Sequence, residues 1–130
     1  MISVLFQTES HFPASRKKIR EAIAVSLATK PKRKTEIGVA IVGDRRMRQL
    51  NKQYRQIDDT TDVLSFSLHE GSSTAPFVDP PDDTLRLGDI VVSYPQAVVE
   101  AAEENKLVDD KIVELVLHGL NHLLGIHHPE

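Results

Sequence analysis

The stretch HGLNHLLGIHH, from His118 to His128, completes the segment that decides the fold. The segment carries apolar residues on nearly every side of a predicted helix: Ile112, Val113, Leu115, Val116, Leu117, Leu120, Leu123 and Leu124. A helix that is apolar nearly all round is expected to be buried. We therefore predict a central helix that starts at Asp109-Asp110 and carries the histidines.

The histidine spacing suits a metal ion. His118 and His122 are four residues apart, so they stand on one helix face and can bind the same ion. We expect Gly125 to end the helix in the left-handed conformation and to return His127 or His128 as a third ligand. Three histidines leave one position of a tetrahedral zinc open to water, as in catalytic sites. The alternative is an ordinary histidine pair at the core edge followed by a polar tail, but buried imidazoles need partners.

Shorter periodic segments precede this helix. We expect strands at residues 2–6, 37–42, 63–68 and 87–92, helices at 13–28, 44–55 and 93–103, and a proline-containing loop at 71–84. Met47, Leu50 and Tyr54 mark the expected buried side of the second helix, and Ser93 and Gln96 have the spacing of a capping box. The predicted class is α+β, with a mixed sheet of about four strands, about four to five helices and the metal-binding helix central. Residues 1–130 are expected to form a single domain.

Charge is distributed unevenly along the chain. Residues 1–55 hold thirteen Lys/Arg against four Asp/Glu, whereas residues 56–130 hold three against fifteen. Basic clusters at 16–20, 30–34 and 45–48 can form one positive surface for a polyanion such as RNA, or they can pair with acidic helices. The absence of cysteine excludes disulfides and thiolate ligands. No signal-peptide pattern or membrane-length apolar run is present, so we expect a cytoplasmic protein.

Four motifs in order resemble one known family. The run from His118 to His128 is similar to the H-G-x-x-H-L-x-G-x-D-H signature of the YbeY family, bacterial endoribonucleases that mature ribosomal RNA. The upstream segments that resemble that family are Leu50-Asn51 followed by Tyr54-Arg55, the TDVLSF run at 61–66 and the LGDI run at 87–90. The usually acidic position before the last histidine is His127 here, and alignment favours His128 as the third ligand.

The resemblance implies a function. It implies one zinc ion held by His118, His122 and His128 with a water, and catalytic roles for His118 and for Arg55, which lies outside the metal shell. It further implies a single-strand-preferring endoribonuclease of ribosomal RNA maturation and ribosome quality control. Partners implied by the same likeness are ribosomal RNA, small-subunit ribosomal proteins and a ribosome-associated GTPase.

Other polar residues have less specific signals. Asp62, Ser65 and Asp89 can orient a zinc-bound histidine or line the cleft, but we favour backbone hydrogen bonding at strand ends. Glu114 shares a helix face with His118 and is expected to be an exposed polar position.

Two competing functions are considered. A metallopeptidase would need a glutamate as general base directly after the first histidine, where this chain has Gly119. The other competitor is a non-catalytic RNA-binding assembly factor whose metal only stabilises the fold.

Overall fold

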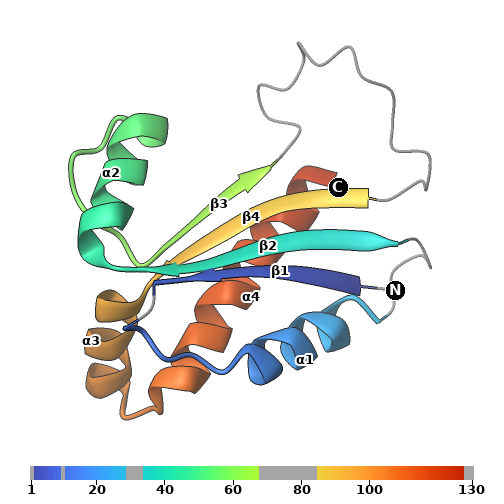
Figure 1. The fold of residues 1–130 in the computed structure, drawn as a ribbon, viewed down its shortest axis with the longest axis horizontal. Helices are drawn as coiled ribbons and strands as arrows, with labels where there is room; N and C mark the ends of the chain where they lie inside the picture. Colours follow the sequence, from blue (N-terminus) through green and yellow to red (C-terminus); the bar gives the residue numbers. More distant parts are fainter. Residues whose placement is uncertain (1, 10, 29–33, 68–84, 128–130) are drawn as a thin grey trace.

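The computed structural model describes residues 2–9, 11–28, 34–67 and 85–127, which include every expected strand and helix except residue 68 at the end of the third strand (Figure 1). The elements follow the order β1 (Ile2–Thr8), α1 (Arg16–Ser26), β2 (Thr35–Val42), α2 (Asp44–Arg55), β3 (Val63–Ser67), β4 (Leu85–Ser93), α3 (Tyr94–Glu104) and α4 (Val108–His127). The predicted α+β class is confirmed. The loop expected at 71–84 lies outside the described residues, as does the third predicted ligand, His128.

The four strands form one mixed sheet in the order β1-β2-β4-β3. β1, β2 and β4 are parallel neighbours, whereas β3 runs antiparallel to β4 and places Ser65 opposite Ile90. β3 is therefore an edge strand of this sheet, and side chains at its rim can take part in a site that opens beside the sheet.

Helices cover both faces of the sheet (Figure 1). On one face, α4 contacts α1, α3, β3 and β4, and the main core contains Ile19, Ile90 and Leu120. On the other face, Met47 of α2 packs with a smaller cluster that includes Val91. The apolar spacing of each helix thus selects the sheet face that it covers, because alternate strand residues point to opposite faces.

This arrangement bears on the two alternatives for the basic clusters. The basic clusters at 16–20 and 45–48 belong to α1 and α2, which cover opposite faces, so they do not form one positive surface. Pairing with acidic residues is also present: Lys18 lies 3.8 Å from Asp110, and Arg48 Nε donates to Asp58 at 2.8 Å. Residues 30–33 of the third cluster lie outside the described residues.

Helix α4 departs from expectation in two ways. It continues through Gly125 to His127, and among the described glycines only Gly88 has a positive φ, so the predicted helix end at Gly125 is wrong. The helix is also not buried all round. Its apolar side is fully buried at Leu120 and Leu123, but His118 and His122 are exposed. The histidines therefore form a polar stripe open to solvent on a helix that apolar packing holds in place.

A carboxylate fixes the start of α2. Asp44 Oδ1 accepts hydrogen bonds from Thr60 Oγ1 at 2.9 Å and from the fully buried Ser93 Oγ at 2.7 Å. Ser93 Oγ also caps α3 by accepting from Gln96 N at 3.3 Å, as the capping-box spacing predicts. The Gln96 amide donates to Asp44 at 3.3 Å. Asp44 therefore connects three chain segments and sets the position of α2.

A buried lysine joins α3 to α4. The Lys111 side chain is 5% exposed and its Nζ donates to Glu104 at 2.9 Å and to Glu114 at 2.7 Å. Lys106 also pairs with Glu114. Hydrogen bonds from Lys106 and Lys111 lower the pKa of Glu114 to about 2, and bonds to Glu114 and Glu104 raise the pKa of Lys111. Glu114 is exposed, as expected, but it also stabilises the helix pair.

No described helix is long and apolar enough to span a membrane.

Candidate active site

Arg55 is placed by the end of α2. Gln56 adopts the left-handed conformation (φ 59°, ψ 29°), and the N–H groups of Gln56 and Ile57 bond back onto the last helical turn. Asn51, only 4% exposed, donates its amide to the carbonyl of Asp59 at 2.9 Å and so holds the returning chain. The returning chain leads into β3, which brings the end of α2 close to the histidine-bearing side of α4.

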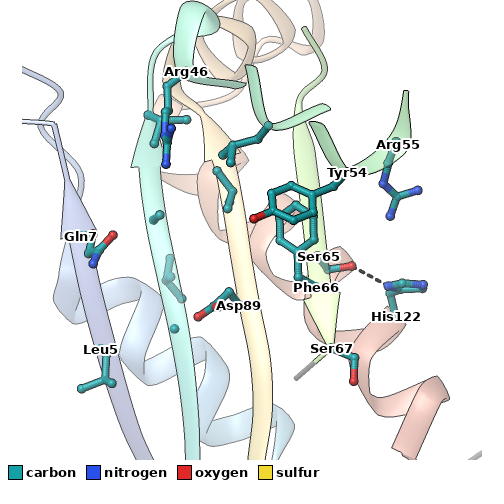
Figure 2. Close-up of a pocket in the computed structure, with 16 residues that line it drawn as sticks. Leu5, Gln7, Arg46, Tyr54, Arg55, Ser65, Phe66, Ser67, Asp89 and His122 are labelled. Atoms are coloured by element: carbon teal, nitrogen blue, oxygen red, sulfur yellow. Dashed lines mark hydrogen bonds between the residues drawn. The ribbon is translucent and has the colours of Figure 1, made fainter. Parts of the chain in front are cut away.

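His122 is oriented by a strand residue. Ser65 Oγ on β3 lies 2.5 Å from His122 Nδ1, and the serine is 7% exposed (Figure 2). In the neutral tautomer with a proton on Nδ1, the ring donates to Ser65 and keeps a lone pair on Nε2. The Ser65 hydroxyl therefore contacts a histidine side chain, whereas backbone hydrogen bonding was favoured for this residue.

One pocket brings the predicted site residues together. A cavity of about 390 Å³ is lined by Arg55, Ser65, His118, Gly119 and His122, among others. Three of the four residues to which the sequence assigns metal or catalytic roles thus share one cavity at the β3 edge of the sheet. His128, the fourth, lies outside the described residues. The chemical roles of all four stay predictions.

The donor set fits a zinc-like cation. Two exposed imidazoles on successive turns of α4 line the cavity, and the Ser65 hydroxyl is hydrogen-bonded to Nδ1 of His122. Neutral imidazole suits zinc, and a partner on the far nitrogen is the usual support for a metal-bound histidine. Within the described part of the chain, no three histidine or carboxylate side chains form a ligand cluster. The two candidates for a third ligand, His127 and His128, have side chains that the structure does not describe.

The two remaining carboxylates lie in different places. The backbone carbonyl of Asp62 accepts from Ser93 N at 2.9 Å, and the residue also lines the histidine cavity. The backbone hydrogen bond favoured for its side chain stays a prediction. Burial, and then the neighbouring Asp62 carboxylate, raise the pKa of Glu100. Asp89 instead lines a second cavity on the α2 face of the sheet, where partial burial raises its pKa.

Gly119 excludes a metallopeptidase base at its position. A Cβ there would lie 2.8 Å from Ile90 Cγ2 on β4, so the helix approaches the sheet closely at this point. A glutamate there would require the Ile90 side chain or α4 to shift. The close approach is to the side chain of Ile90.

The sequence interpretation missed an aromatic pair beside the site. Tyr54 was expected on the buried side of α2 but is 54% exposed, and its ring centroid lies 5.0 Å from that of Phe66. Both rings line the second cavity, of about 820 Å³, which shares Arg55, Ser65 and His122 with the histidine cavity. Their adjacency in sequence to Arg55 and Ser65 was the available signal.

The fold and the cavity define an α+β protein with a histidine pair beside a guanidinium at a sheet edge. The sequence profile of the family described as Endoribonuclease YbeY matches residues 5–130. The chain therefore belongs to the YbeY family.

Individual relatives agree with this assignment. An Endoribonuclease YbeY of Dehalococcoides mccartyi is 42% identical over 101 residues, covering 74% of this chain and 63% of the relative. The protein of the same name from Moorella thermoacetica is 42% identical over 94 residues, covering 72% of this chain and 60% of that relative. This chain thus spans about three fifths of the length of these relatives. The solution structure of a Thermotoga maritima protein shares the fold, with a TM-score of 0.59, 23% identity, and coverage of 95% of this chain and 71% of that one.

Proposed function

We propose that this chain is a zinc-dependent endoribonuclease that prefers single-stranded RNA and acts in ribosomal RNA maturation and ribosome quality control. The observation that carries the proposal is the shared cavity of Arg55, His118 and His122. Membership of a family named for endoribonuclease activity supports the reaction class.

In the proposed site the histidines bind the metal and Arg55 binds the substrate. In this proposal His118, His122 and His128 hold one zinc ion, which when bound supplies an acidified water and polarises a phosphoryl oxygen. Ser65 is a positioning residue that keeps the His122 ring turned toward the cavity. Arg55 offers two parallel N–H donors to phosphate oxygens and stabilises the charge that develops on them during cleavage.

The burial pattern favours a catalytic over a structural metal. Ile112, Val116, Leu120 and Leu123 of α4 are each no more than 1% exposed, so the helix is anchored without its histidines. A metal that only stabilised the fold would be expected to replace such packing. We expect chelation of the metal to abolish cleavage while circular dichroism at the assay temperature is unchanged.

The proposed substrate is ribosomal RNA, and the proposed partners are small-subunit ribosomal proteins and a ribosome-associated GTPase. Arg46 and Arg55, both on α2, line cavities on the side where the RNA would lie. Because phosphate contacts release counterions, we expect the affinity for single-stranded RNA to fall steeply as salt is added. An affinity independent of salt would contradict an electrostatic contribution from α2.

Cleavage of a ribosomal RNA fragment by the zinc-loaded protein tests the proposal. Arg55→Ala should slow cleavage by about 100- to 1,000-fold, the usual loss when one charge-stabilising donor is removed, and His118→Ala should abolish it. Arg48→Ala is the matched control, because Arg48 lies on the same helix but is paired with Asp58. Full cleavage by the Arg55 variant, or equal loss in the Arg48 variant, would overturn the proposal.

A further inference from the structure

The second cavity, which continues from the histidine site, has features that the proposed cleavage chemistry does not use. Its volume is about 820 Å³, and its floor is the face of the sheet that α2 covers only in part. Tyr54 and Arg46 of α2 approach it from one side, and Gln7 of β1 borders the other (Figure 2). Because Arg55, Ser65 and His122 border both cavities, a ligand in the second cavity would lie directly beside the histidine pair.

The aromatic pair gives this cavity an apolar wall. The Tyr54 ring is tilted by 58° to the Phe66 ring at 5.0 Å, and Tyr54 is 54% exposed despite its size. An exposed tyrosine held against a second ring has little freedom left to lose on binding, so it is suited to stacking on a planar group.

Two guanidinium groups flank the aromatic surface. Neither Arg46 nor Arg55 has a hydrogen bond or ion pair with the described residues, whereas Arg48 on the same helix is bonded to Asp58 at 2.8 Å. Arg46 lies before Leu50 in the sequence of α2 and Arg55 lies after it, and both line the cavity. Stacking side chains combined with cations that follow the backbone are the usual basis of single-stranded nucleic acid binding.

Asp89 provides a directional polar group on the cavity floor. No hydrogen bond or ion pair joins its carboxylate to the described residues, and the side chain lies over Gly38, where an added Cβ would be 2.1 Å from Oδ1. A glycine on the neighbouring strand is therefore what leaves room for the carboxylate. An ionised carboxylate only accepts hydrogen bonds, so its ligand must present N–H or O–H donors.

We infer that this cavity is a nucleoside subsite that stacks one unpaired base on Tyr54 and reads its Watson–Crick edge with Asp89, next to the phosphate bound by Arg55. The inference rests on the proposed RNA substrate. Guanine is the favoured base, because N1–H and the N2 amino group are adjacent donors that match the two oxygens of a carboxylate. An apolar peptide is disfavoured as occupant, because it would bury both guanidinium groups without partners.

Binding of short single-stranded oligonucleotides tests the subsite separately from cleavage. Fluorescence anisotropy is measured on the zinc-loaded protein with labelled oligouridine that contains one guanosine, inosine or adenosine, and a gel afterwards verifies that the strand is intact. We expect guanosine to bind tightest, since inosine lacks the N2 amino group. Tyr54→Ala should weaken binding by roughly 5- to 100-fold, the range for loss of one stacked base, and Tyr54→Phe should restore it.

Asp89→Asn should remove the preference for guanosine over inosine and leave a common residual affinity, while Arg48→Ala should bind all three as the unaltered protein does. The subsite is overturned if Tyr54→Ala binds normally with its circular dichroism unchanged, or if Asp89→Asn keeps the guanosine preference. If the oligonucleotides bind with the expected guanosine preference and the expected effects of Tyr54→Ala and Asp89→Asn, but no RNA is cleaved, the nuclease proposal fails and the subsite stands. If Tyr54→Ala and Asp89→Asn both cleave RNA and also bind the oligonucleotides as the unaltered protein does, the nuclease proposal stands and the subsite is rejected.

Discussion

Replacement of Ser65 by alanine removes the hydroxyl that contacts His122 Nδ1. A hydrogen bond between neutral groups contributes about 0.5–1.5 kcal/mol to stability, and loss of a group that orients a metal-bound histidine weakens metal binding by about 10- to 100-fold. The imidazole is exposed, so water can take the place of the serine on Nδ1. We therefore expect the lower end of both ranges: about a 10-fold loss of zinc affinity and less than about 1 kcal/mol of unfolding free energy.

Competition with a chromophoric chelator measures the zinc affinity, and urea unfolding of the metal-free protein measures stability. Ser67→Ala is the matched control, because Ser67 is 5% exposed on the same strand and points away from His122 in Figure 2. Ser65→Thr keeps a hydroxyl and should restore most of the affinity. If Ser65→Ala binds zinc as tightly as the unaltered protein, or if Ser67→Ala loses as much, the proposed role of Ser65 is refuted.

Three further predictions concern the frame of the site. Lys111→Met should lower the free energy of unfolding in urea by about 2 kcal/mol. This is less than the roughly 3–5 kcal/mol lost when a fully buried ion pair is broken, because the partners Glu104 and Glu114 are 40% and 47% exposed. The lowered pKa of Glu114, about 2 against 4.5, means that this carboxylate stabilises the fold above pH 4.5 and loses that effect as the pH falls toward 2. The stability gap between the unaltered protein and Glu114→Gln should therefore close across that interval, and a constant gap would contradict the pairing. Asp44→Ala leaves the buried Ser93 hydroxyl without its acceptor and should cost about 2 kcal/mol in the same urea assay.

Local sequence patterns predicted most of the fold. Apolar periodicity predicted the strand at 37–42 and the helix at 13–28, and in the structure Ile19 and Ile23 of α1 are buried. Ser93 was placed correctly as the cap of α3. These features depend on neighbours within a few residues, so the sequence carries them directly.

Features set by distant contacts could not be derived in this way. The strand order β1-β2-β4-β3 and the assignment of α1 and α2 to opposite faces depend on pairing between segments far apart in the chain. The sequence therefore left two alternatives for the basic clusters, one positive surface or pairing with acidic residues. Tyr54 follows the apolar spacing of α2, but its end of the helix extends over a cavity, so the ring is exposed.

The site was predictable in composition but not in geometry. The histidine spacing and the family motifs selected Arg55, His118 and His122, which line one cavity. The bond from Ser65 to His122 joins residues 57 positions apart and has no local signal. Gly125 was expected to end α4 because glycine permits a left-handed turn, but that freedom does not require one, and the helix continues to His127.

Anomalous scattering at the zinc edge from crystals of the zinc-loaded protein measures the position of the ion directly. We expect one peak about 2.0–2.1 Å from a ring nitrogen of each of His118 and His122, with His128 as the third protein ligand and Arg55 facing the same cavity. A peak remote from His118 and His122, or no peak in protein that retains zinc-dependent cleavage, would contradict the proposal that this histidine pair forms the catalytic metal site.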